Sequence, residues 1–336
     1  MGDSLTSGEQ EVEVNCRDLN AYVELQTIRR KDIFGPTMVK TRRINVNSDF
    51  LDPEEIKVLP ANRKPAPDFF VRFKKTILSY YQREGRDLAW RHTTDPYLIF
   101  VSEIMLQQTQ VGRVTVKYPE FIDAFPTFAA LANAPLHQVL AVWQGMGYNR
   151  RAIALHKCAK QVMTTFGGEL PHDVERLVTL PGIGHATACS IAAFAFNMPV
   201  AFIETNIRRV FIHFFFPDRL SVTDREILPL VEQSLDIKNP RIWYWALMDV
   251  GSALKKTVPN PNKKSAHYTR QSKFVGSDRQ IRGIILRSLV TNPQQDEKEL
   301  VRSISVSEDR AHKVIDRLAK EGFISRNGTT LIISDR

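Results

Sequence analysis

Cysteine is scarce in this sequence. The 336 residues contain three cysteines, Cys16, Cys158 and Cys189, and their spacing matches no metal-binding motif. Three thiols cannot pair evenly, and proteins that depend on disulfides need an even set. The cysteine pattern therefore argues against a disulfide scaffold and favours a reducing compartment.

Acidic residues are almost missing from one stretch. Between Lys255 and Arg287 there are nine lysines and arginines against a single acid, Asp278. The net charge of this stretch is +8, nearly the whole formal charge of +9. A positive field concentrated in one region fits a polyanionic partner.

The start MGDSLTSGEQE is acidic and polar, so we expect no secretion signal. The one long uncharged run, Ala186–Ile203, is about long enough to span a membrane. Thr187, Ser190, Asn197 and Pro199 break it into a buried helix and an extended piece. We therefore expect no membrane partner, and a cytoplasmic (nucleoid-associated) or nuclear location.

The chain divides into four tracts. Residues 1–65 have weak periodicity and no role that we can assign. Residues 66–254 repeat apolar residues at helical spacing, which predicts a compact all-α core. Residues 255–276 form a basic loop. Residues 277–336 predict three helices and then a β-hairpin at Asn327-Gly328, the order of a winged helix, with a generic small domain as the alternative.

Within the core, helices are predicted between short breaks that proline or glycine provides. The predicted helices cover residues 69–81, 97–114, 127–134, 136–146, 151–166 and 173–180, and the punctuating prolines are Pro119, Pro126, Pro135, Pro171 and Pro181.

The segment LPGIGHATA joins two of these helices through Pro-Gly-x-Gly. Gly182 and Gly184 let the backbone turn tightly. Backbone N–H groups at the start of the next helix would then offer a phosphate site. A plain helix–turn–helix also uses glycine in this place, so the segment alone leaves both interpretations open.

Five blocks follow one another along the chain: LAWR…DPYLIFVSEIMLQQTQV, FPTFAALANAPLHQVLAVWQGMGYNRRAIALHKCA, LPGIGHATACSIAAFAF, FIETNIRRVF and WALMDVGS. Taken in this order, the five blocks resemble the helix-hairpin-helix DNA glycosylases, and within them the MutY-type A/G-specific adenine glycosylases. The resemblance implies an all-α helix-hairpin-helix glycosylase core, with two helical lobes and a cleft between them, before the winged-helix-like α+β domain.

The chemistry of such enzymes needs two carboxylates. The target base must leave the DNA stack, and its N-glycosidic bond then breaks through a transition state with oxocarbenium character. The resemblance implies that Glu103 protonates the adenine ring, which requires a pKa raised by burial. Gln107 is expected one turn further on the same helix face, where the family glutamine fills space in the opened duplex.

Glu204 departs from the family pattern. The family has an aspartate followed by Gly and Asn, whereas this chain has Glu204, Thr205 and Asn206. The longer side chain leaves three interpretations open. Glu204 does the aspartate's work in a rebuilt site, which we favour; or it serves a different base; or it caps the next helix beside Arg208.

Further residues carry over by position. The base pocket would comprise Arg86, Leu88, Trp90, Arg91 and Asp249. Contacts to DNA would come from Gln107, Gln108, Tyr148, Gly182, Gly184, His185, Ala186, Thr187, Lys255, Lys256, Lys263 and Lys264. For Trp90 and Tyr148, ordinary core packing is the alternative to stacking on a base.

Two family features are missing. Relatives that also cut the strand carry a lysine where this chain has Ala186, so no amine is available for a Schiff base. The four cysteines of a [4Fe–4S] cluster would fall at Lys255, Asn262, Ser265 and Gln271. We expect no cofactor and a cluster-free basic loop held by hydrogen bonds, with a solvated linker as the alternative. A monovalent ion at the hairpin backbone stays open.

The expected function is monofunctional removal of adenine mispaired with 8-oxoguanine or guanine. The expected partner is double-stranded DNA with a mispaired or damaged base, bound by a monomer. The family domain that reads 8-oxoguanine is replaced here by the winged-helix-like region. Two alternatives remain: a glycosylase for another base, such as thymine opposite guanine, and a DNA-binding protein without catalysis.

Overall fold

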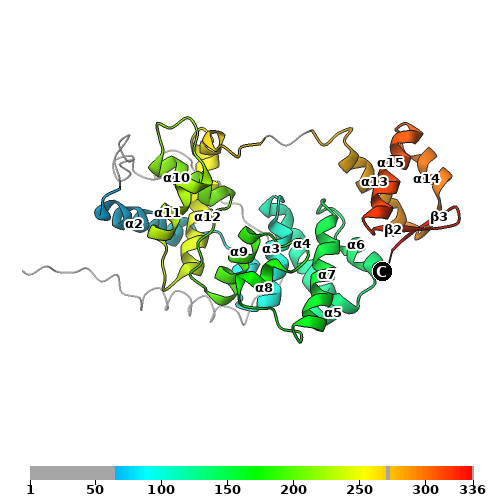
Figure 1. Cartoon of the computed structure of the whole chain (residues 1–336), viewed down its shortest axis with the longest axis horizontal. Coiled ribbons are helices and arrows are strands. Elements are labelled where there is room, and N and C mark those ends of the chain that lie inside the picture. Colours follow the sequence, from blue (N-terminus) through cyan, green and yellow to red (C-terminus); the bar gives the residue numbers. More distant parts are fainter. Residues whose placement is uncertain (1–64, 270–272, 335–336) are drawn as a thin grey trace, which may run out of the picture. The chain divides into compact units, whose positions relative to one another are not determined.

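The computed structural model describes residues 65–269 and 273–334 (Figure 1). The predictions made for the N-terminal tract and for Gln271 therefore lie outside the described residues, apart from residue 65. None of the described helices is long and apolar enough to cross a membrane.

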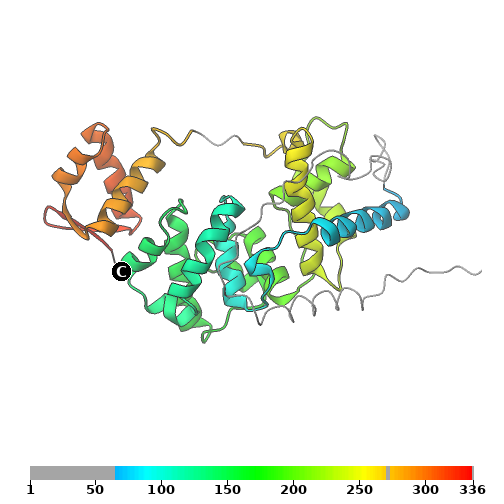
Figure 2. The ribbon, with the colours of Figure 1, turned by 180° about the vertical axis from the view of Figure 1, so that it is seen from behind.

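One group of helices is formed by both ends of the core. Helix α2 (Pro67–Glu84) packs on α12 (Pro240–Thr257), and α12 packs on α10 (Thr205–Phe215), as both views of the ribbon show (Figures 1 and 2). Helix α11 (Asp224–Ser234) and the short η3 (Pro261–Lys264) also pack on α10. The group closes around aromatic rings, with Phe73 in edge contact with Phe211, Phe214, Phe215 and Trp243.

The second group comes from the middle of the core. Helix α3 packs on α4, α7 and α9, and α7 packs on α5 and α6. Helix α9 also packs on α12, which joins the two groups and confirms the predicted all-α core. The elements are η2 (Ala89–Arg91), α3 (Pro96–Leu106), α4 (Val111–Ala124), α5 (Phe128–Asn133), α6 (Leu136–Val142), α7 (Arg150–Thr165), α8 (Val174–Val178) and α9 (His185–Phe196).

Two predictions about the core helices are wrong. The helix expected over 97–114 is two helices, because α3 ends at Leu106 and α4 begins at Val111. Side-chain donors from Arg151 take up the backbone carbonyls at the end of α3, so the helical hydrogen bonds do not continue. Pro119 lies inside α4 and does not end it. Pro119 and Thr115 are both exposed, so water can hydrate the carbonyl that the proline leaves without its helical donor.

Residues after 277 form a small α+β unit. The sheet is antiparallel with strand order β1-β3-β2, and Gly328 at φ 62° turns the chain between β2 and β3, as the Asn-Gly pair predicted. Strand β1 was not predicted from the sequence. The elements are α13 (Asp278–Thr291), β1 (Gln294–Asp296), α14 (Glu297–Ser303), α15 (Glu308–Lys320), β2 (Ile324–Asn327) and β3 (Thr330–Ile333). Helix α13 packs on α15 and β3, and also on α6 of the core.

Candidate active site

Glu103 lies on α3, against the uncharged helix α9. Ser190 Oγ donates a hydrogen bond of 2.7 Å to Glu103 Oε2. The pKa of Glu103 is raised to about 7, mainly by burial; the Ser190 hydrogen bond opposes the rise, the charge of Glu204 adds to it, and Arg91 opposes it. Near neutral pH this carboxyl is therefore present in both protonation states, as a proton donor requires.

Glu204 is the N-cap of α10. Its Oε1 accepts hydrogen bonds from the backbone N–H groups of Asn206 (2.6 Å) and Ile207 (2.9 Å). Burial raises the pKa of Glu204, and these two hydrogen bonds, followed by Arg209 and Arg208, oppose the rise. A carboxylate held by two N–H groups at a helix N-terminus is favoured in its charged form. Here burial outweighs the two N–H groups and the arginines, so the pKa of Glu204, like that of the electrostatically coupled Glu103, lies above its ordinary value.

The start of α10 is held close to α12. A Cβ added at Gly251 would lie 2.7 Å from Asn206 Cβ and would also collide with the Asn206 backbone, so only glycine allows this approach. Arg209, which is 4% exposed, donates to the Gly251 carbonyl at 2.5 Å and to Asn206 Oδ1 at 2.7 Å. The backbone that carries Glu204 is thus fixed from two sides. Arg208 pairs with Asp224 at 2.7 Å instead of with Glu204.

Asp249 joins α12 to the segment before α3. Its side chain is buried, and both carboxylate oxygens receive donors from Arg86 and Arg91, with the Arg91 fork bound at 2.8 Å to each oxygen. Arg91 also lies over Trp245, with 5.5 Å between the guanidinium carbon and the ring centre. These three residues of the predicted base pocket meet in one ionic cluster around the buried Asp249 carboxylate.

Leu88 and Trp90 are buried in the core. Leu88 is 7% exposed and Trp90 is 5% exposed, with the Trp90 ring in edge contact with Tyr118 at 5.6 Å between centres. The packing matches the alternative that the sequence left open for Trp90, and a role of either residue in base binding stays a prediction.

The turn between α8 and α9 presents its backbone to the surface. Gly182 has φ 77°, and a Cβ there would lie 2.8 Å from Ala154 Cβ, so this turn needs glycine. Gly184, His185 and Ala186 are exposed at the N-terminus of α9. Gln107 Nε2 donates to Thr187 Oγ1 at 3.3 Å, which connects this turn to the end of α3.

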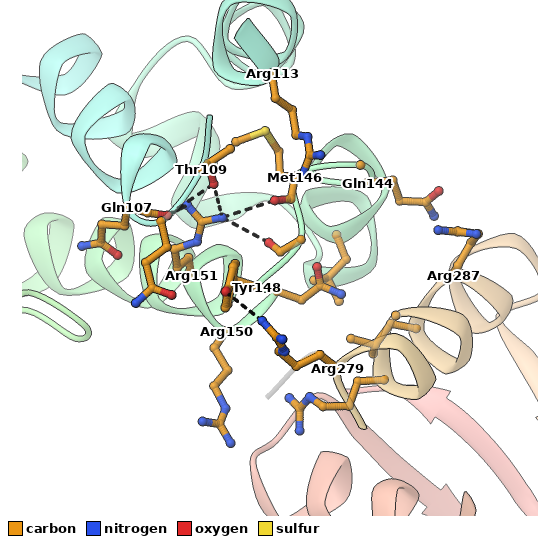
Figure 3. A pocket seen from close by; sticks show the side chains of 18 of the residues that line it. Gln107, Thr109, Arg113, Gln144, Met146, Tyr148, Arg150, Arg151, Arg279 and Arg287 are labelled. Carbon is orange, nitrogen blue, oxygen red and sulfur yellow. Dashed lines mark hydrogen bonds between the residues drawn. The ribbon is translucent and has the colours of Figure 1, made fainter. Parts of the chain in front are cut away.

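Buried Arg151 holds two loops together, 107–110 and 145–149 (Figure 3). Burial lowers the pKa of Arg151 to about 10, a value at which the side chain is still charged at neutral pH. Its two terminal nitrogens donate to the carbonyls of Ile104 (3.0 Å), Met105 (2.8 Å), Gln107 (2.6 Å), Met146 (3.4 Å) and Gly147 (3.3 Å), and to Thr109 Oγ1 (2.8 Å).

Each loop carries one residue other than glycine in the left-handed region, Gln108 at φ 52° and Tyr148 at φ 47°. Such a backbone is uncommon without glycine and persists where the surroundings enforce it. The Tyr148 ring is 36% exposed and lies 5.5 Å from the Arg151 guanidinium carbon. Gln107 begins the first loop and does not continue the face of Glu103 on α3, which corrects the expected placement.

The basic segment is partly helical. Helix α12 extends to Thr257, so exposed Lys255 and Lys256 belong to its last turn and not to a loop. Lys263 is exposed, whereas Lys264 Nζ donates to the Pro217 carbonyl.

The family has cysteines of an iron–sulfur cluster at four positions, and those of the four that the structure describes carry no thiol here. Asn262 is buried and donates to the Thr205 carbonyl at 2.9 Å, and Ser265 is buried beside Val222 in an isolated β-bridge. Within residues 65–269 and 273–334, no group of three or more His, Cys, Asp or Glu side chains could hold a metal ion. The residues at these positions do not fit the cluster.

Sequence reasoning missed two functional positions. Ser190 could have been noticed as a hydroxyl inside the uncharged run, one helical face of which contacts Glu103. Arg151 stands beside Arg150 in a polar segment, and nothing in the local pattern indicates that one of the two is buried.

Comparison with known proteins supports the resemblance. Residues 101–235 match the family model described as HhH-GPD superfamily base excision DNA repair protein. A solved structure titled as a thermostable thymine-DNA glycosylase is 26% identical, with a TM-score of 0.49, and the match covers 55% of this chain and 86% of that one. The matched residues thus resemble a family of base excision DNA repair proteins of the helix-hairpin-helix type.

The curated relatives narrow this class. A protein from Mycobacterium tuberculosis (strain CDC 1551 / Oshkosh) named adenine DNA glycosylase is 44% identical over 135 residues, which is 40% of this chain and 44% of the relative. One of the same name from Mycolicibacterium smegmatis is 34% identical over 276 residues, which is 74% of this chain and 92% of the relative. The match thus spans about half the length of the first relative and nearly all of the second. This chain belongs to the adenine DNA glycosylase family.

Proposed function

We propose that this protein is a monofunctional DNA glycosylase that removes adenine mispaired with 8-oxoguanine or guanine. One observation carries the proposal: Glu103, with a pKa raised to about 7, is electrostatically coupled to Glu204 at the start of α10. A solvated pair of helix glutamates would show neither feature. The names of the relatives supply adenine as the target.

In this proposal Glu103 and Glu204 have different roles in catalysis. Glu103 gives its proton to a ring nitrogen of the extruded adenine, so the base can leave with both electrons of the C1′–N bond. In its charged form, which the two N–H groups favour, Glu204 faces the positive charge that develops on the sugar. Water adds to C1′, and its proton returns to a carboxylate. Because Ala186 offers no amine, the reaction ends at an abasic site.

The remaining parts bind DNA in this proposal. The exposed turn at Gly184 receives a phosphate of the target strand, and Lys255, Lys256 and Lys263 add positive charge. The element order after Asp278 and the sheet order β1-β3-β2 support a winged-helix-like domain. The segment in place of the cluster loop is held by hydrogen bonds such as Asn262 to Thr205, without metal. A monomer suffices, because both acids belong to one chain.

Three duplexes test the function: adenine opposite 8-oxoguanine, adenine opposite guanine, and thymine opposite guanine. Strand cleavage that appears only after alkali is expected for both adenine duplexes. Cleavage of the thymine duplex alone would contradict adenine as the target, and tight binding without cleavage would indicate a binding protein.

Two substitutions test the acids. Glu103→Gln should abolish excision and keep binding, because it removes the proton and little else. Glu204→Asp should retain activity and Glu204→Gln should lose it, because only the former keeps the charge. Equal rates for both Glu204 variants would make Glu204 a helix cap alone.

A further inference from the structure

The proposed proton donor, Glu103, shares one serine hydroxyl with the backbone of α9. Ser190 Oγ lies 2.7 Å from Glu103 Oε2 and 2.9 Å from the carbonyl oxygen of Thr187, three residues earlier in the helix. A serine hydroxyl has a single hydrogen, so it donates to one of these two acceptors at a time. Both distances suit an O–H···O hydrogen bond, so the Ser190 oxygen can serve either acceptor without moving.

The surroundings fix the position of this hydroxyl. Ser190 is 5% exposed and lies in the interior of α9, so bulk water does not compete for its hydrogen. Helices α3 and α9 pack on each other, and Gln107 Nε2 donates to Thr187 Oγ1 across the same contact. The hydrogen of Ser190 can therefore change direction by rotation about the Cβ–Oγ bond, while the three oxygens stay in place.

The two carboxyl oxygens of Glu103 differ in their partners. Within residues 65–269 and 273–334, Oε2 accepts the Ser190 hydroxyl, whereas Oε1 accepts no hydrogen bond. Glu103 as a whole is half-buried. Oε1 is therefore the oxygen that is available to carry a proton to a bound base, because the protein already occupies Oε2.

Few other groups act on this carboxyl. Burial raises the pKa of Glu103; of the charged side chains, Glu204 on α10 adds to the rise and Arg91 on η2 opposes it. Arg91 directs its terminal nitrogens to Asp249 and not to Glu103. Among the residues that the structure describes, Ser190 is thus the hydrogen-bond donor of Glu103.

The titratable groups on the neighbouring helices contact other parts of α3. Tyr118 of α4 donates to a backbone carbonyl of α3, and Arg151 of α7 donates to the carbonyls at its end. The titratable side chains of α9 are His185, which is exposed, and Cys189, which stays neutral because burial raises its pKa to about 11. None of these four groups replaces the contact from Ser190.

We propose that Ser190 is a positioning residue whose hydroxyl turns from the Thr187 carbonyl to Glu103 Oε2 as Glu103 gives up its proton. The inference rests on the proposed function for the proton acceptor, a ring nitrogen of the extruded adenine. The proton leaves Oε1, and the electron pair of the broken O–H bond stays on the carboxylate. Because hydrogen bonds to charged acceptors are stronger than those to neutral ones, the Ser190 contact strengthens as the charge forms. It therefore stabilises the transition state more than the resting acid.

Removal of the hydroxyl tests this role. Ser190→Ala should slow single-turnover excision of adenine about three- to tenfold at pH 6, where Glu103 is mostly protonated. Affinity for the duplex should not change, because the lost contact strengthens only when the charge forms. The alkaline limb of the pH–rate profile should move up by about 1 pH unit, since a carboxylate without its donor holds the proton more tightly. Alanine favours helix, so α9 should still form.

Ser234→Ala is the matched control. Ser234 is fully buried on α11, and its hydroxyl donates to the Val231 carbonyl, three residues earlier, at 3.2 Å. This is the ordinary contact of a serine inside a helix. The control removes the same kind of hydroxyl away from the acid, so its excision rate, duplex affinity and pH profile should match those of the native protein.

The protonation of Glu103 can also be followed without excision. Carbon-13 NMR of the full chain, labelled at the glutamate carboxyls, identifies Glu103 by the signal that Glu103→Gln removes. The midpoint is expected near pH 7 in the native protein and about 1 pH unit higher in Ser190→Ala. An unchanged midpoint, or an equal rate loss in Ser190→Ala and Ser234→Ala, overturns the role of Ser190. If the native protein excised no adenine while the midpoint still shifted, the proposed function would be refuted and not the Ser190 contact.

Discussion

Burial gives Glu103 a pKa of about 7, compared with 4.5 for an ordinary glutamate. The folded protein therefore holds this proton more tightly than the unfolded chain does. The stability that the bound proton provides is complete below about pH 4.5 and is lost as the pH rises through about 7. The shift of about 2.5 pH units corresponds to about 3 kcal/mol of destabilisation at alkaline pH.

Glu103→Gln removes this penalty, because the amide is never charged and its oxygen can still accept the Ser190 hydroxyl. The variant should exceed the native protein in free energy of unfolding by about 3 kcal/mol at pH 8 and by less than about 1 kcal/mol at pH 5. Urea denaturation at the two pH values measures both differences. The same variant should have lost excision.

Glu232→Gln is the control, since Glu232 is an exposed glutamate on α11 and should change stability equally at both pH values. A Glu103→Gln effect that does not vary between pH 5 and pH 8 would refute a buried carboxyl with a raised pKa. The proposed proton transfer would then lose its physical basis.

Further predictions concern the residues that hold the candidate active site in place. Gly251→Ala should cost about 1–3 kcal/mol of unfolding free energy, because the new methyl group meets Asn206, whereas Gly112→Ala in open space should change it by less than about 1 kcal/mol. Asp249→Asn should cost about 3–5 kcal/mol, since it leaves two paired arginines without a charge partner; equal urea midpoints would contradict this. Arg151→Met should keep most helical circular dichroism but lower excision and mismatch affinity together, and unchanged affinity would show that the loops hold without it.

Sequence periodicity predicted most helices, because an amphipathic pattern depends on neighbours along the chain. It could not predict the break after Leu106. That break depends on Arg151, which lies 44 residues beyond Gln107 and takes its carbonyl. The prediction that Pro119 separates two helices was wrong for a related reason. A proline is tolerated in a helix where the freed carbonyl faces water.

The candidate site, like the fold, was predicted from the sequence only in part. The resemblance to the family singled out Glu103 and Glu204, and the structure couples them electrostatically. The cap that Glu204 provides for α10 was only one of three interpretations. The contact of Ser190 with Glu103 could not be predicted from the sequence, because it depends on how α3 and α9 pack.

The position of Glu204 also has a practical consequence. An amide oxygen at residue 204 could still accept the N–H groups of Asn206 and Ile207, so a charge-neutral replacement should leave α10 correctly folded. Such a variant would be folded but inactive. It would stay bound to its lesion and would serve as a reagent for isolating damaged duplexes.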